Sequence, residues 1–106
     1  MLEFEKIKTQ RLLFVKCKGD LDIECEEIVH EELIPAMIHE KNVRVDFSNV
    51  HFVDSSGMGL LISLVKTLKD KDINITIQNI NDDILEVFDL LQIPQIIGSD
   101  VLLLES

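Results

Sequence analysis

The stretch NVHFVDSSGMGLLISLVKTLK, residues 49–69, follows an alternating strand pattern and contains the start of an apolar helical pattern. Asp54 and Ser55 are residue types that accept hydrogen bonds from the free amides of a helix N-terminus, which predicts that a helix begins here. Apolar residues then recur at steps of three and four, the spacing of a helix with one buried face. They are Met58, Leu61, Ile62, Val65 and Leu68. The hydroxyls of Ser55 and Ser56 are therefore expected at the positive end of a helix dipole.

Two glycines, Gly57 and Gly59, follow these hydroxyls. Because glycine has no Cβ, the first turn of the helix is left bare, and another backbone or a partner protein could approach it closely. A phosphoacceptor or docking site would be built in this way. A serine at a helix start is more often only a cap, so the local chemistry leaves both interpretations open.

Length and charge narrow the possible functions. The 106 residues predict one domain, residues 1–106, with a single core and too little chain for a two-lobed enzyme. Hydrophobic residues make up 46% of the chain, but no apolar run is long enough for a membrane span or a signal peptide. The formal net charge of −10 opposes binding to nucleic acid, whose phosphates carry the same sign. We therefore expect a cytoplasmic protein that binds a protein partner with a basic or apolar surface.

The cysteines and histidines do not indicate a metal or cofactor site. Cys17 and Cys25 lack a metal-binding spacing and are too few for a disulfide framework, which suits reduced thiols in a cytosol. We expect both to be small core residues. His30 and His39 are nine residues apart and each precedes a glutamate, so they are interpreted as surface residues. No cofactor and no metal are predicted.

Two strands and a helix are predicted in the first 39 residues. Residues 2–8 and 12–18 alternate as strands and are expected to pair as a hairpin at a sheet edge, and residues 19–22 read as a loop. A helix is predicted over residues 24–39, where Pro35 should kink or divide it. Its buried stripe is expected to be Cys25, Val29, Leu33 and Met37.

The second half of the chain continues the alternation of strands and helices. Residues 43–47 and 73–78 predict strands on either side of the central helix. A further helix should be capped by residues 79–82 and stop before Pro94, with Ile84, Val87, Phe88 and Leu91 on its apolar stripe. Residues 96–97 suggest a short last strand, and residues 99–105 a turn or two of helix.

This order of elements predicts the fold class. Two strand-helix-strand crossovers imply that part of the sheet is parallel. In each crossover the helix carries the chain back to the end of the sheet where the first strand began, so the next strand runs in the same direction. We expect a single α/β domain with a mixed sheet of four or five strands and helices packed mainly on one face. Strands 43–47 and 73–78 should be parallel neighbours.

Three segments resemble the STAS domain family, and most closely its single-domain bacterial anti-sigma factor antagonists. They are GDLD at residues 19–22, VRVDFSNV at residues 43–50 and FVDSSGMGL at residues 52–60. The resemblance extends over nearly the whole chain in element order and implies a STAS-like α/β fold.

In that family the serine directly after the motif aspartate is phosphorylated by an anti-sigma factor that is also a serine kinase. A metal-dependent serine phosphatase removes the phosphate. The resemblance assigns the phosphoacceptor role to Ser55, and implies that the unmodified form binds the anti-sigma factor and frees the sigma factor. The partner-binding residues that it implies are Asp22, Asp54, Ser56, Gly57, Met58 and Gly59.

Two other functions compete with this interpretation. A non-phosphorylated STAS module could act as a scaffold, or as a subunit of a signalling or lipid-transport assembly, and the motif does not exclude it. An enzyme with Ser55 as nucleophile is not favoured, because the residues around it do not form a G-x-S-x-G elbow. The three histidines also show no base-and-orienter arrangement, so we expect no enzymatic activity.

Overall fold

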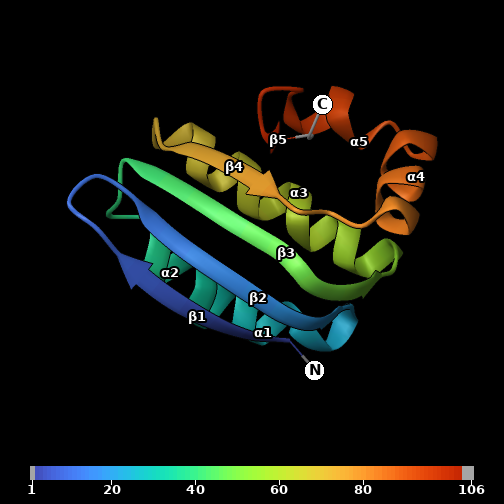
Figure 1. The fold of residues 1–106 in the computed structure, drawn as a ribbon, viewed down its shortest axis with the longest axis horizontal. Helices are drawn as coiled ribbons and strands as arrows, with labels where there is room; N and C mark the ends of the chain where they lie inside the picture. The colour runs from blue at the N-terminus through green and yellow to red at the C-terminus, as the bar shows by residue number, and fades with distance from the viewer. Residues whose placement is uncertain (1, 104–106) are drawn as a thin grey trace.

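The computed structural model describes residues 2–103, which form a five-stranded sheet with helices (Figure 1). The sheet has the order β1-β2-β3-β4-β5, in which β1 runs antiparallel to β2 and all other neighbours are parallel. The predicted α/β fold with a mixed sheet is confirmed. The strands are β1 (Glu3–Lys8), β2 (Leu13–Leu21), β3 (Asn42–Val53), β4 (Asn74–Gln78) and β5 (Leu102–Leu103).

The two faces of the sheet differ in polarity. One face is apolar and buried, as the alternation predicted, and carries Leu13, Val15, Cys17, Val43, Val45, Ile75 and Ile77. On the other face, the register brings Glu5, Lys16, Asp46 and Gln78 into one row across four strands. In Figure 1 the helices between β2 and β4 lie behind the sheet, so they cover its apolar face.

The helix predicted over residues 24–39 is a helical run that changes its winding and ends at Met37. It consists of η1 (Ile23–Cys25), α1 (Glu26–Ile28), the π-helical η2 (Val29–Leu33) and α2 (Ile34–Met37). The amide of Ile34 donates to the carbonyl of Val29, which widens the turn just before Pro35. Proline has no amide proton and its ring crowds the preceding turn, so the run divides there, as predicted.

β2 and β3 are longer than their patterns predicted. Residues 19–22 were expected to form a loop, but β2 continues to Leu21 because it pairs with the extended β3. Gly19 lies opposite Val50, and Leu21 lies opposite Val53. Two register shifts place extra residues in β3, and such bulges bend a strand. Both strands therefore end together at one end of the sheet.

The helix of the central stretch is α3 (Ser55–Asp70), which begins at the predicted residue and connects β3 to β4. β3 and β4 are parallel neighbours, so this prediction is also confirmed. α4 (Asp82–Leu90) follows Asn81, whose side chain accepts a hydrogen bond from the amide of Ile84. The same side chain donates to the carbonyl of Val50 at 3.2 Å. Asn81 thus ties the start of α4 to β3.

Two predictions for the C-terminal part were wrong. Residues 96–97 belong to a helix, α5 (Ile93–Ile97), because Ile93 and Ile97 are both buried at a helical spacing of four. The last strand is β5, which pairs with Ile77 and Gln78 of β4. The helix expected over residues 99–105 is therefore absent from the described part of that segment, and residues 104–105 lie outside the described residues.

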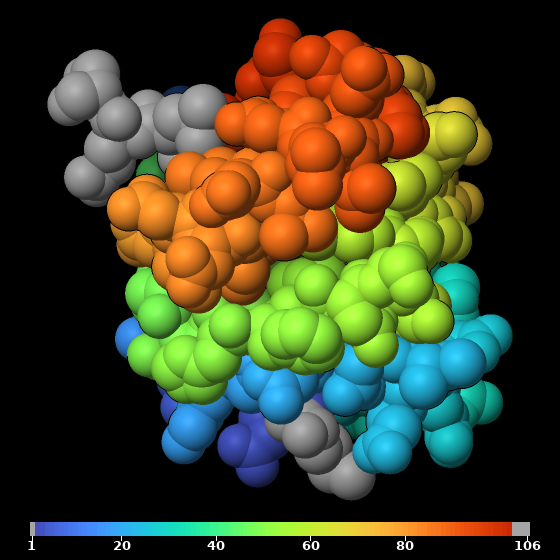
Figure 2. Space-filling view, turned by 90° about the vertical axis from the view of Figure 1, so that its right-hand side faces the viewer, coloured from blue at the N-terminus to red at the C-terminus, as the bar shows by residue number. Residues whose placement is uncertain are grey.

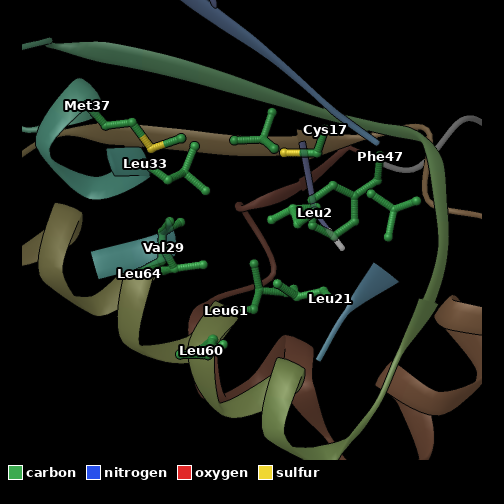
Figure 3. A pocket seen from close by; sticks show the side chains of 12 residues that line it. Leu2, Cys17, Leu21, Val29, Leu33, Met37, Phe47, Leu60, Leu61 and Leu64 are labelled. Atoms are coloured by element: carbon green, nitrogen blue, oxygen red, sulfur yellow. The ribbon is translucent and has the colours of Figure 1, made fainter. Parts of the chain in front are cut away.

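A small apolar cavity lies in the core between the sheet, the helical run and α3. Its volume is about 20 Å³, and its lining includes Cys17, Val29, Met37, Phe47 and Leu61. Figure 3 shows side chains of the helical run and of α3 on one side of it and Cys17 and Phe47 on the other. A wholly apolar space of this size is a packing gap, because a buried water would need polar partners.

Candidate functional site

The entrance of α3, residues 54–57, has the geometry of a capped helix N-terminus. Asp54 has an extended backbone, and its Oδ1 accepts the amide of Gly57 at 2.7 Å. The amide of Met58 closes the first turn on the carbonyl of Asp54 at 2.8 Å. The amides of Ser55 and Ser56 lack intrahelical acceptors by the geometry of any helix start. Asp54 is therefore the cap, and Ser55 is the first residue of the helix.

Ser55 is exposed, and Ser56 is half-buried. A kinase needs a hydroxyl that it can reach, and of these two neighbours Ser55 offers the more accessible one. An anion on Ser55 would also sit beside the helix amides and the positive end of the α3 dipole. The free amides and the dipole at this helix start can therefore accommodate a negative charge on Ser55.

The Asp22 turn, residues 21–25, lies against the entrance of α3. Asp22 caps η1, and its Oδ1 accepts the amide of Glu24 at 3.0 Å. The amide of Asp54 donates to the carbonyl of Leu21 at 3.2 Å, so the residues directly before Ser55 and before Asp22 are hydrogen-bonded. Because β2 and β3 are parallel, their ends meet at the same edge of the sheet.

The three remaining motif residues differ in what they offer a partner. Gly59 is exposed, and a Cβ at this position would meet nothing within 4 Å. Gly57 is buried, and a Cβ there would lie 2.0 Å from the carbonyl oxygen of Leu21, so it serves close packing within the chain. The Met58 side chain is only 3% exposed. Gly57 and Met58 therefore lie inside the chain, and their place among the partner-binding residues stays a prediction.

Two exposed apolar side chains at this end of the molecule were not found from the sequence. Ile23 is 66% exposed directly after Asp22, and Phe52 is 53% exposed opposite Asp20 in the register. The place of Ile23 beside the motif aspartate was the available signal, whereas Phe52 lies beyond the strand predicted over residues 43–47 and is marked only by its place in the motif at residues 52–60. Figure 2 shows this face, where the blue, green and orange segments of the chain meet.

This end of the molecule is acidic. Neither residues 19–40 nor residues 45–65 contain a lysine or arginine. Asp20 lies near the end of β2, and the turns and helix starts here carry the carboxylates of Asp22, Glu24, Asp54, Asp82 and Asp83. Within residues 2–103, no group of three metal-ligating side chains could hold an ion. The field at this end therefore favours a basic protein surface.

The resolved pKa shifts belong to the sheet and not to the α3 entrance. Burial opposes ionisation of Asp46, but hydrogen bonds from Ser48, Asn79 and Gln78 outweigh it and hold the pKa of Asp46 below the usual value of an aspartate. Burial, and secondarily the charge of Asp46, raises the pKa of Cys17 to about 12. Cys17 is thus a neutral core residue, as predicted.

Comparison with known proteins identifies relatives over most of the chain. The model of the STAS domain family matches residues 3–103. The anti-sigma-B factor antagonist of Staphylococcus epidermidis is 33% identical over 91 residues, which are 84% of this chain and 83% of that protein. The structure of the anti-sigma factor antagonist SpoIIAA in its unphosphorylated form has a TM-score of 0.73 at 19% identity, covering 98% of this chain and 89% of that one.

The phosphorylated form of the Bacillus cell fate determinant SpoIIAA has a TM-score of 0.67 at 20% identity, covering 98% of this chain and 92% of that one. At these identities the structural likeness shows a shared fold. In the described part of the chain, none of the helices combines the length and the apolar character needed to cross a membrane.

Proposed function

Because this chain belongs to the STAS domain family and, within it, to the anti-sigma factor antagonists, we propose that it is a partner switch controlled at Ser55. The unphosphorylated chain binds an anti-sigma factor and thereby releases the sigma factor. Phosphorylation of Ser55 ends that binding. The observation that carries the proposal is the exposed Ser55 hydroxyl at the capped start of α3, held beside the Asp22 turn.

The partners in this proposal supply the chemistry. In the kinase reaction, the Ser55 oxygen bonds to the γ-phosphorus of ATP, the bond to the β-phosphate oxygen breaks, and a base of the kinase accepts the hydroxyl proton. A metal-dependent phosphatase returns the hydroxyl by hydrolysis. The chain itself is a cytoplasmic regulator and substrate of these enzymes, and it needs no cofactor of its own.

The effect of the phosphate follows from charge. The phosphate adds a charge of about −1.5 to −2 and three acceptor oxygens at the start of α3, where free amides and the helix dipole accommodate an anion. The fold should therefore survive modification. The negative charges of the Asp22 and Asp54 carboxylates repel the phosphate. A partner surface that fits a neutral hydroxyl would also bind the phosphorylated serine less well. A loss of ~2.7 kcal/mol in binding free energy weakens a complex about a hundredfold.

The surface that a partner would contact combines charge with two apolar anchors. Ser55, Ser56, Asp54 and Gly59 line the α3 entrance, and Asp22 lies in the adjoining turn. Ile23 and Phe52 are exposed nearby, and buried apolar anchors usually dominate the energy of protein interfaces. An anti-sigma factor with a basic surface and an apolar pocket fits this arrangement.

Incubation of the full chain with its cognate anti-sigma kinase and ATP, followed by mass spectrometry, tests the assignment. We expect one phosphate on Ser55. Ser55→Ala should take up none and keep the partner bound, whereas Ser56→Ala, the matched control on the neighbouring hydroxyl, should still be phosphorylated. Titration calorimetry should show that the phosphorylated chain binds about a hundredfold more weakly.

Phosphate on Ser56 with Ser55 unmodified would overturn the assignment. If the kinase binds the chain but phosphorylates neither serine, the non-phosphorylated scaffold is the better description.

A further inference from the structure

The carboxylate of Asp22 is held by a buried thiol as well as by a backbone amide. Cys25 is 1% exposed, and its Sγ lies 3.2 Å from the carbonyl oxygen of Asp20 and 3.6 Å from Oδ1 of Asp22. The same Oδ1 accepts the amide of Glu24. A thiol carries one proton, so these two acceptors share one weak donor. The Cys25 thiol is thus an interior donor within hydrogen-bonding reach of the motif aspartate, with the Asp20 carbonyl as its nearer acceptor.

A second interior contact joins this turn to α3. The carbonyl of Leu21 accepts the amide of Asp54 and also lies against the Cα of Gly57, with no space for a Cβ between them. An interior packed this closely transmits displacement, because neither side can move without opening a gap or a clash. The positions of the Asp22 turn and of the α3 entrance are therefore coupled through Leu21.

We propose that Cys25 is a positioning residue for the Asp22 carboxylate, and that the Asp22 turn and the α3 entrance form one rigid recognition unit. Cys25 fixes the orientation of the carboxylate within the turn, and the Leu21–Gly57 contact fixes the turn against Ser55. A partner then meets both groups in a preset arrangement and spends little binding free energy on ordering them. This inference rests on the proposed function, since it concerns how the same site is presented.

The chain offers a matched control, because Cys17 is also a buried cysteine, and its thiol makes no hydrogen bond to Asp22. Cys17 lines the core cavity, which Leu21 also lines. The variants are Cys25→Ala, Cys25→Ser and Cys17→Ala in the full chain. Serine keeps a single donor in nearly the same volume, so Cys25→Ser is a rescue variant. Both alanine variants lose buried volume and should lose stability, but only Cys25→Ala removes the donor to Asp22. An effect seen in Cys25→Ala and not in Cys17→Ala therefore reports positioning and not a general loss of stability.

The first measurement needs no partner. In 15N NMR spectra, Cys25→Ala should shift the Glu24 amide, which shares the Asp22 acceptor, and should speed hydrogen exchange at the Asp54 amide, which bonds to Leu21. Cys17→Ala should leave both amides as in the unmodified chain. An unchanged Glu24 shift and unchanged Asp54 exchange in Cys25→Ala would overturn the coupling.

The second measurement is the affinity for the anti-sigma kinase by titration calorimetry. Cys25→Ala should bind about fivefold more weakly, the effect of losing one modest hydrogen bond, and Cys25→Ser should recover to within about twofold. Cys17→Ala should bind like the unmodified chain. Equal weakening by both alanine variants would contradict a positioning role. If even the unmodified chain fails to bind, the proposed function fails, and the NMR result alone decides the coupling.

Discussion

Gly57 and Gly59 are two residues apart in α3, yet the structure gives them different roles. A Cβ at Gly57 would overlap the carbonyl of Leu21, whereas a Cβ at Gly59 would point into open space. Glycine inside a helix costs about 1 kcal/mol relative to alanine. At Gly57 that cost is offset by close packing within the chain. At Gly59 no contact within the described residues explains it, which agrees with the proposed approach of a partner.

The two alanine substitutions should therefore change stability in opposite directions. Gly59→Ala should raise the free energy of unfolding by ~0.5–1 kcal/mol, or roughly 2–6 °C in Tm, because alanine favours the helix. Gly57→Ala should lower it by ~1–3 kcal/mol, because the new methyl group must displace the Leu21 carbonyl. Thermal unfolding followed by circular dichroism measures both, and stabilisation by Gly57→Ala would refute the packing role.

The buried carboxylate of Asp46 should make stability depend on acid pH. Asp46 is 7% exposed and accepts the Ser48 amide at 2.7 Å beside the register shift in β3. Despite its burial, its pKa in the folded chain is lowered from the usual value of an aspartate by the hydrogen bonds that its carboxylate accepts. The folded state thus favours the ionised form. This contribution is complete above the unfolded pKa and is lost as the pH falls through the lower folded pKa.

Urea unfolding at several pH values tests this contribution. The stability difference between the unmodified chain and Asp46→Asn should be constant from pH 7 to about 5 and should shrink as the pH falls below about 4. Asp89→Asn, which changes an exposed aspartate of α4, is the control for the general effect of removing a charge. A difference that grows on acidification would mean that the pKa of Asp46 is raised by folding.

At the scale of elements, a single side chain determines where α4 begins and what it packs against. Asn81 accepts the amide of Ile84 at 2.8 Å and donates to the carbonyl of Val50 at 3.2 Å. It therefore caps the helix and connects it to β3. The start of α2 in the helical run before β3 differs from this, because no side chain caps it. A π turn in the backbone accommodates Pro35 there instead.

Substitutions at Asn81 should separate its two bonds. Asn81→Ala should lower the free energy of unfolding by about 2 kcal/mol, because it removes both the cap and the link to Val50. Asn81→Asp keeps the cap but has no donor for the carbonyl, so its loss should be about half as large. Urea denaturation measures both variants. Equal losses would show that only the link to Val50 matters.

At the scale of the whole molecule, acidic and basic residues are unevenly distributed. The net charge is −10, and the end that carries Ser55 contains two long segments without any lysine or arginine. Like charges crowded on one end repel each other more strongly in the folded chain than in the unfolded chain. This repulsion is screened by salt, since the Debye length falls to about 10 Å at 0.1 M.

The folded chain should therefore become more stable as salt is added. We expect the Tm to rise by a few degrees, roughly 2–6 °C, between 10 mM and 300 mM salt, because screening relieves the repulsion. Differential scanning calorimetry in NaCl and in KCl measures this, and the same rise in both salts excludes an effect specific to one of the two cations. A falling Tm would mean that attractive ion pairs dominate instead.

Local patterns in the sequence were sufficient for the start of the site and for most of the elements. The start of α3 at Ser55 and the period of β4 depend on residues close together in the chain, so they were predicted correctly. The stripe of the helical run was also correct, since Cys25, Val29, Leu33 and Met37 are all buried. The period of the apolar residues indicates which face of a helix or strand packs against the core, and it depends only on residues near one another in the sequence.

The tertiary structure alone decided the extent of the strands, the last elements and the packing within the site. β2 and β3 continue to Leu21 and Val53 because each supplies hydrogen bonds to the other, and β5 exists because β4 offers it a free edge. The contact between Gly57 and Leu21 joins residues 36 positions apart. Such pairings depend on which distant backbone comes within hydrogen-bonding or van der Waals distance, and no local pattern in the sequence encodes that distance.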